Sequence, residues 1–256
     1  MNQRFSGMVA VVSGGAGGAG RAATLRFAAE GASVGIVDIQ SQAGEQLAIE
    51  IEAAGGQAMF VEADVSQAQA VKTAVDRILQ RFAKIDILFN HAGTLIVKPF
   101  LETTEAEWDW LMAVNVKSMF LMSQAILPSM LEAGGGTIIN TASISSTTAA
   151  SMESLYCTTK GAVLQLTRAI AVEFRDRGIR CNAIAPGFIR TPHGLREMEE
   201  CTALGVDFTE ADMKKVQGRF CEPEEIANVA AFLASDDASF INGASITVDN
   251  TWTAAT

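Results

Sequence analysis

The chain has 256 residues, 49% of them hydrophobic, so it is long enough to bury a large core within one domain. Its 19 Lys and Arg against 29 Asp and Glu give a net charge of -10, which disfavours nucleic acid and anionic membranes as partners. The four cysteines form no C-x-x-C pair and the two histidines, His91 and His193, lie far apart, so neither a disulfide framework nor a metal site is expected.

The same features bear on localisation. Reduced thiols are typical of the cytoplasm, which is the compartment we expect. The first hydrophobic run, residues 8–12, is too short for a signal peptide core. Later runs stay below the length of a membrane-spanning helix, so we expect no membrane contact.

Short hydrophobic runs alternate along the chain with segments of helical pattern. The first four runs show little polar alternation, as expected for parallel strands covered on both faces. We predict strands at residues 8–12, 33–37, 58–62, 85–89, 136–140, 179–185 and 245–248. We predict helices at residues 18–30, 42–54, 67–82, 106–131, 154–177 and 223–234. The pattern predicts an α/β fold in which residues 1–256 form a single domain with a doubly wound, Rossmann-like parallel sheet and helices on both faces.

The regular alternation stops between Pro186 and Arg219. This stretch contains Thr191-Pro192-His193 and mixed charges. In a compact domain such a segment is typical of a lid or binding loop. We therefore predict a substrate lid at about residues 187–220.

A glycine-rich turn, SGGAGGAG at residues 13–20, follows the first strand and precedes a helical pattern. Glycines allow a positive φ and a close approach of backbone N–H groups to a pyrophosphate, which the helix N-terminus also favours. The turn fits two frames, Gly15-x-Gly17-x-x-Gly20 and Gly14-x-x-x-Gly18-x-Gly20, and the residues alone do not choose between them.

Asp38 ends the second predicted strand, at about the 20-residue offset where an acidic residue accepts hydrogen bonds from the adenosine ribose. A carboxylate there also repels the additional phosphate of NADP, so NAD is the expected cofactor. The alternative is that Asp38 only caps the following helix.

Tyr156 is the only tyrosine in the chain, and Lys160 follows it at i+4, so a helix places both side chains on one face. A buried ammonium beside a phenol is expected to lower the phenol pKa from about 10 by roughly 2–3 units, which makes the tyrosine a usable base. Such a pair is common on solvated helix faces and needs support. Ser143, in a small polar loop after the fifth strand, supplies it.

With these motifs in order, together with Asn90-His91-Ala92-Gly93 and Asn115, residues 8–248 resemble the short-chain dehydrogenase/reductase family. The resemblance favours the second glycine frame, with Ser13 in the place of the family's threonine, and His91 replaces an asparagine. It implies the catalytic residues Asn115, Ser143, Tyr156 and Lys160. It implies the cofactor-binding residues Ser13, Gly14, Gly18, Ala19, Gly20, Asp38, Ile39, Asp64, Val65, Asn90, Ala92, Gly93, Tyr156, Lys160, Pro186, Gly187, Ile189 and Thr191.

The resemblance also implies roles. Ser143 binds the substrate oxygen, and Tyr156 takes the hydroxyl proton while hydride passes to the nicotinamide. Lys160 stabilises the phenolate and holds the ribose, and Asn115 holds a water that links Lys160 to solvent. A disturbed helix at Asn115 would open that water site.

The expected function is therefore NAD-dependent interconversion of a secondary alcohol and a ketone. Alternatives are an NADPH-dependent 3-ketoacyl thioester reductase, which Asp38 opposes, and a non-catalytic nicotinamide-sensing protein. The resemblance implies a homo-oligomer, a tetramer or dimer. The family ends its last strand with V-D-G-G, whereas Asp249-Asn250-Thr251 stand here, which puts the local turn in doubt.

Several signals in and near the lid are weak. We assign no role to His193, Arg196, Lys214 or Lys215, which fit solvated surface charge. Three hydrophobic residues fit either pocket lining or ordinary packing: Leu95, Met152 and Phe188.

Overall fold

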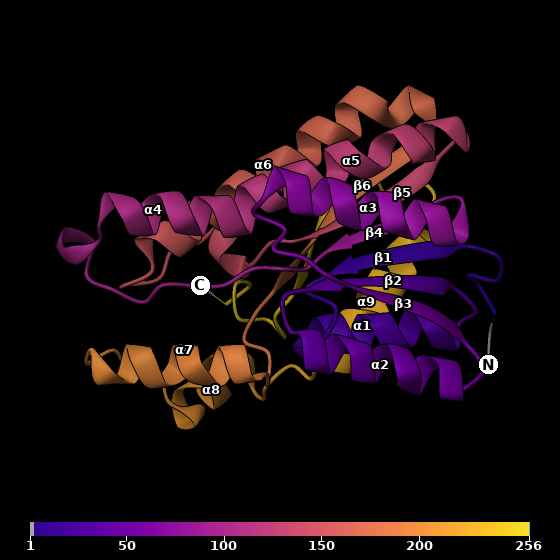
Figure 1. Cartoon of the computed structure of the whole chain (residues 1–256). Coiled ribbons are helices and arrows are strands. Elements are labelled where there is room, and N and C mark those ends of the chain that lie inside the picture. Colours follow the sequence, from indigo (N-terminus) through magenta and orange to yellow (C-terminus); the bar gives the residue numbers. More distant parts are fainter. Residues whose placement is uncertain (1–2, 256) are drawn as a thin grey trace.

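In the computed structural model, which describes residues 3–255, seven strands form one parallel sheet in the order β3-β2-β1-β4-β5-β6-β7 (Figure 1). The strands are β1 Val9–Ser13, β2 Ser33–Asp38, β3 Gln57–Glu62, β4 Ile87–Asn90, β5 Gly136–Thr141, β6 Ile179–Pro186 and β7 Ser245–Val248. The predicted doubly wound sheet is confirmed. The strand order reverses between β1 and β4, and side chains at the carboxyl ends of strands meet there.

Helices cover both faces of the sheet because alternate strand residues point to opposite sides (Figure 1). In β1, Ala10 and Val12 pack with one set of helices, whereas Val9 and Val11 pack with the other. The first set is α1 Gly18–Ala29, α2 Ser41–Ala53 and α9 Pro223–Ala234. The second is α3 Ala68–Phe82, α5 Ser118–Glu132 and α6 Ser154–Phe174.

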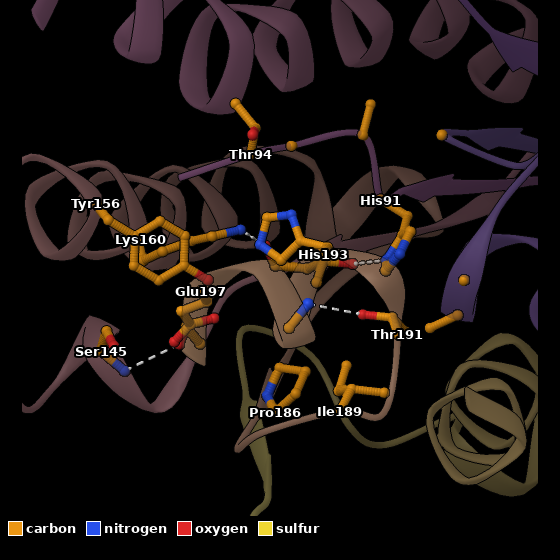
Figure 2. Close-up of a pocket in the computed structure, with 18 of the residues that line it drawn as sticks. His91, Thr94, Ser145, Tyr156, Lys160, Pro186, Ile189, Thr191, His193 and Glu197 are labelled. Carbon is orange, nitrogen blue, oxygen red and sulfur yellow. Dashed lines mark hydrogen bonds between the residues drawn. The ribbon is translucent and has the colours of Figure 1, made fainter. Parts of the chain in front are cut away.

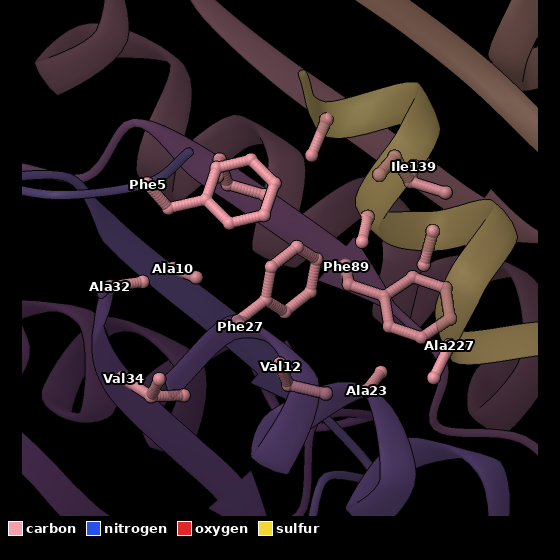
Figure 3. Packing of buried hydrophobic residues seen from close by; sticks show 14 of the residues in the cluster. Phe5, Ala10, Val12, Ala23, Phe27, Ala32, Val34, Phe89, Ile139 and Ala227 are labelled. Atoms are coloured by element: carbon pink, nitrogen blue, oxygen red, sulfur yellow. The ribbon is translucent and has the colours of Figure 1, made fainter. Parts of the chain in front are cut away.

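Aromatic rings fill the layer between the sheet and helices α1 and α9. Phe5 and Phe27 meet edge to face with ring centres 5.4 Å apart, and Phe89 lies in the same cluster (Figure 3). All three rings are fully buried. This packing holds α1, and with it the glycine-rich turn, against the sheet.

The helix predicted at residues 106–131 is interrupted. It consists of α4 Glu105–Met112, a π-helical turn Ala113–Lys117 centred on Asn115, and α5. The prediction that no run approaches membrane-spanning length was also wrong, because within residues 3–255 the helical run Glu105–Glu132 is long and apolar enough by composition. Its apolar character is explained by the core, where Met122 and Met130 of α5 are fully buried.

The lid segment is more regular than the sequence pattern suggested. It contains α7 Pro192–Ala203 and α8 Glu210–Gln217, which lie beyond the end of the sheet, opposite α4 (Figure 1). Thr191 caps α7 with Pro192 in the first turn, and Thr209 forms a capping box with Asp212. Pro192 therefore stands at the start of a helix within the stretch that was predicted as a loop.

Candidate active site

A cavity of about 930 Å³ opens at the carboxyl ends of the strands. Its wall is formed by the glycine-rich turn, the ends of β2 and β3, the loops after β4, β5 and β6, helix α7 and the C-terminal segment. This volume is typical of a small-molecule site. Most of the predicted site residues line it: Gly14, Gly18, Ala19, Asp38, Ile39, Asp64, Val65, Ala92, Gly93, Ser143, Tyr156, Lys160, Pro186, Gly187, Ile189 and Thr191.

Four predicted site residues, Ser13, Gly20, Asn90 and Asn115, are instead buried in the framework around the cavity. Ser13 Oγ accepts hydrogen bonds from the backbone N–H groups of the loop after β4, at 3.2 and 3.3 Å. Asn90 Nδ2 donates to Asn140 Oδ1 at 2.9 Å and joins β4 to β5. These side chains fix the loops that form the wall.

The glycine-rich turn fits a phosphate. A Cβ at Gly14, where φ is +67°, would lie 2.8 Å from the backbone of Ala92, and a Cβ at Gly20 would lie 1.9 Å from the Gly14 carbonyl oxygen. Gly18 also has a positive φ, whereas Gly17 has room for a side chain. These constraints favour the second glycine frame. The cavity meets the N-terminus of α1, where backbone N–H groups and the helix dipole attract an anion.

Asp38 is fixed at the end of β2 beside this turn. Its Oδ2 accepts from the Ala16 N–H at 3.0 Å, and its Oδ1 accepts from the Gln40 N–H at 3.0 Å. The carboxylate is buried and lines the cavity. It therefore joins the glycine-rich turn to the start of α2 and keeps lone pairs for a ligand hydroxyl.

His91, which replaces the family's asparagine, is a neutral packing residue. Its Nδ1 lies 3.0 Å from Thr141 Oγ1, and its ring packs beside Phe89 at 5.2 Å. Burial, with the nearby Lys160 ammonium, lowers the pKa of His91 to about 3. The substitution thus brings no charge to the site at neutral pH.

Asn115 clamps the loop after β4 to α6. Its Oδ1 accepts from the Thr94 N–H at 2.8 Å, and its Nδ2 donates to the Thr94 carbonyl at 2.8 Å and to Thr159 Oγ1 at 3.0 Å. The expected disturbance of the helix is confirmed by the π-helical turn. The side-chain amide is engaged by protein groups, so the water link from Asn115 to Lys160 stays a prediction.

Ser143, Tyr156 and Lys160 line the same cavity, and Figure 2 shows Tyr156 and Lys160 close together. Ser143 follows β5, and its side chain lies close enough to Tyr156 to favour the phenolate. Lys160 is 4% exposed, and its Nζ donates to the Thr141 carbonyl at 2.8 Å. The same Nζ lies 5.5 Å from the centre of the Tyr156 ring. The spacing of one helical turn in α6 therefore brings hydroxyl and ammonium to one place, as predicted.

The expected pKa of Tyr156 was wrong for this state of the protein. Burial raises the pKa of Tyr156 above its ordinary value, and the Glu197 carboxylate raises it further, while the hydrogen bond to Ser143 acts in the opposite direction. Burial also lowers the pKa of Lys160 to about 8. The Glu197 carboxylate, which the sequence did not reveal, thus disfavours the phenolate.

Sequence reasoning missed one side of the cavity. Glu153 lies three residues before Tyr156, and Glu197 lies on α7, four residues after His193. Both line the cavity together with His193 and Arg196, to which no role was assigned. The i−3 spacing of Glu153 from the only tyrosine was an available signal.

The structure also locates the other residues whose role was not clear from the sequence. Phe188 lines the cavity, whereas Leu95 and Met152 do not, and Leu95 is buried. Lys214 pairs with Glu210 at 3.2 Å and Lys215 pairs with Asp212 at 2.8 Å on the surface of α8.

The C-terminal segment closes the cavity against the lid. Asn250 and Thr251, which stand where the family has glycines, adopt φ values of +44° and +76°. The left-handed turn is thus formed without glycine. It places Trp252 on the cluster that contains Phe188, Met213 and Phe220.

Comparisons with known proteins identify the family of the chain. Residues 14–253 match the family model described as enoyl-(acyl carrier protein) reductase. The chain is 38% identical over 253 residues to D-threitol dehydrogenase of Mycolicibacterium smegmatis, covering 98% of this chain and 94% of the relative. It is 37% identical over 256 residues to cyclohexanol dehydrogenase of an Acinetobacter species, covering 99% and 98%. The crystal structure of levodione reductase matches with a TM-score of 0.94 at 35% identity, covering 99% of this chain and 100% of that one.

The chain therefore belongs to the short-chain dehydrogenase/reductase family, as the motifs predicted. It is an oxidoreductase that acts on CH–OH groups with a nicotinamide cofactor.

Proposed function

We propose that this protein oxidises a secondary alcohol to a ketone, and catalyses the reverse reaction, with NAD as the cofactor. The observation that carries the proposal is the meeting of Ser143, Tyr156 and Lys160 in one cavity with the N-terminus of α1 and Asp38. The named activities of the relatives, on threitol and cyclohexanol, support an alcohol substrate.

The residues divide the chemistry between them. Ser143 holds the substrate oxygen next to the Tyr156 hydroxyl, to whose phenolate form it is already favourably placed. Tyr156 accepts the proton of the alcohol in oxidation and returns it in reduction. When bound, the oxidised nicotinamide supplies the hydride acceptor and a positive charge near the ring. Lys160, held by the Thr141 carbonyl, provides a second positive charge that favours the phenolate.

NAD is favoured over NADP by the carboxylate of Asp38. That side chain is held in place by two backbone N–H groups at the end of β2. A fixed carboxylate offers acceptors to two ribose hydroxyls but repels a phosphate in the same place. Asp64 and Val65 form the adjoining wall, where we place the adenine.

We also propose that residues 1–256 act as one domain whose lid, about residues 187–220, carries α7 and α8 over the substrate. Asn115 is a positioning residue in this scheme, because it holds Thr94 and α6. The exposed Trp108, Phe120 and Val172 on α4, α5 and α6 support a homo-oligomer. We place the protein in the cytoplasm.

The test is a panel of secondary alcohols incubated with the wild-type protein and either NAD or NADP, followed by NADH or NADPH absorbance. We expect reduction of NAD by at least one alcohol and a lower kcat/KM with NADP. Turnover confined to a 3-ketoacyl thioester with NADPH would replace the proposal with the reductase alternative. Binding of NADH without turnover of any substrate would favour a nicotinamide-sensing protein.

A further inference from the structure

Two carboxyl groups face the reacting hydroxyls from the lid side of the cavity. Glu153 precedes α6 and is 3% exposed, and Glu197 reaches the cavity from α7. Their side chains are hydrogen-bonded to each other, and Cys201 Sγ lies 3.8 Å from Glu153 Oε1. Figure 2 shows Glu197 beside the hydroxyl end of Tyr156. The pair therefore lies beside the hydroxyl that the proposed reaction uses.

The surroundings of this pair disfavour its ionisation. Burial and the neighbouring Glu153 carboxylate raise the pKa of Glu197 well above its usual range, and burial also raises the pKa of Glu153. Two buried carboxyl groups in hydrogen-bond contact cannot both ionise easily, because a negative charge on one disfavours ionisation of the other. The carboxyl oxygens that are not used between the two groups can accept a hydrogen bond from a hydroxyl.

The surrounding charged groups leave this negative charge facing the cavity. Arg196 lies beside Glu200 at 3.5 Å, and its Nη2 donates to Thr94 Oγ1 at 3.1 Å. His193 is neutral, because burial and the nearby cations lower its pKa to about 4. Lys160 is engaged by the Thr141 carbonyl.

The rest of this end of the cavity is mostly apolar. Trp110, Val114 and Phe208 line it together with the alanines at 149 and 150. A polar group on the substrate thus finds strong partners at the carboxyl pair, whereas a substrate carboxylate there would meet like charge in a poorly solvated place.

We propose that Glu153 and Glu197 form the recognition site for a second, neighbouring hydroxyl, so that the preferred substrates are diols or polyols and hydroxy acids are rejected. This inference rests on the proposed function and names the substrate class of the same site. It assigns Glu153 and Glu197 to specificity and leaves the proton and hydride transfers with the groups already described.

The test compares kcat/KM for three related alcohols: 2-butanol, 2,3-butanediol and 3-hydroxybutyrate. We expect the wild-type protein to prefer the diol. In Glu197→Gln the ratio of kcat/KM for the diol to kcat/KM for 2-butanol should fall by roughly tenfold or more, because a hydrogen bond to a charged group is lost. The difference in kcat/KM between the diol and the hydroxy acid should also become smaller. Glu153→Gln should act in the same direction and provides an independent variant if Glu197→Gln does not fold.

The matched control is Glu199→Gln, which neutralises an exposed carboxylate on the same helix. Its ratios should equal those of the wild type, and thermal melting should show that all variants are folded. The subsite would be overturned if the kcat/KM ratios were unchanged in both Glu197→Gln and Glu153→Gln. It would also be overturned if the wild type preferred the hydroxy acid. In either case the proposed alcohol dehydrogenase activity would stand. Absence of oxidation of all alcohols by the wild type would instead remove the proposed function, and the subsite with it.

Discussion

Lys160 Nζ lies 5.5 Å from the centre of the Tyr156 ring, one turn further along α6, and is held there by the carbonyl oxygen of Thr141 at 2.8 Å. The ammonium is thus fixed by the backbone of β5 rather than by a carboxylate. Among residues 3–255 no acid forms an ion pair with this ammonium, so its charge is available to ligands in the cavity. This geometry leads to predictions about the ionisation of two groups, Tyr156 and Lys160.

The first concerns the proton of Tyr156. Because burial and Glu197 raise its pKa, the phenol of the cofactor-free protein should ionise only above about pH 10, the ordinary value. Tyr156 is the only tyrosine, so ultraviolet absorbance of tyrosinate reports it alone. Addition of NAD should move the transition to lower pH, since positive charge favours the phenolate. A transition complete below about pH 9 without cofactor would contradict this prediction, and Tyr156→Phe supplies the baseline.

The second concerns stability. The pKa of Lys160 falls to about 8 on folding, from about 10.4 in an unfolded chain, so the buried ammonium opposes folding below about pH 8. Between these values the unfolded chain binds more protons, and stability of the wild type should rise with pH. Lys160→Met should therefore be more stable at neutral pH by about 1–2 kcal/mol, after the lost hydrogen bond is counted.

Denaturant unfolding of the cofactor-free proteins at several pH values measures this difference. The advantage of Lys160→Met should shrink as the pH rises from about 8 toward 10.4. A variant that is less stable by the same amount at every pH would show that the ammonium carries no burial penalty.

The fold was predictable because its signals are local. Each buried strand is a short hydrophobic run, and β1, the glycine-rich turn and α1 follow one another without a break. The π-helical turn at Asn115 was expected only as a disturbance, since its clamp on Thr94 joins residues 21 positions apart. Helices α7 and α8 were missed because their caps lie among prolines, glycines and charges that also suit a loop.

In the site, Tyr156, Lys160 and Asp38 were predictable from spacing within or just after one element. The pairing of Glu153 with Glu197 was not, because α7 must fold over α6 before the two carboxyl groups meet. The pKa of Tyr156 was mispredicted for the same reason: its direction depends on acids that approach from a distant segment.

Asp38 provides a test of cofactor choice. Asp38→Asn keeps the shape of the side chain but removes the charge that repels the phosphate of NADP. The ratio of kcat/KM for NADP to that for NAD should rise roughly tenfold, which corresponds to about 1.4 kcal/mol. Asp64→Asn, in the same cavity wall, is the control and should affect both cofactors alike. An unchanged ratio in Asp38→Asn would remove Asp38 from ribose recognition.

The C-terminal turn contains a source of strain. Thr251 is β-branched and has a φ of +76°, a conformation that favours glycine. Thr251→Gly should be more stable than Thr251→Ala by about 1 kcal/mol, because alanine keeps a Cβ at this φ. Thermal or denaturant unfolding measures the difference, and equal stability of the two variants would show that the turn relaxes without strain.

The central claim is that the Tyr156 hydroxyl transfers the proton of the alcohol. The most direct measurement compares Tyr156→Phe with the wild type in two assays, NAD-dependent oxidation of the best alcohol and NADH binding by fluorescence. Loss of the hydroxyl should lower kcat by roughly 10²–10⁴-fold and leave NADH affinity nearly unchanged, as expected for removal of an acid–base group. A variant that keeps most of its turnover while binding NADH normally would contradict the assignment.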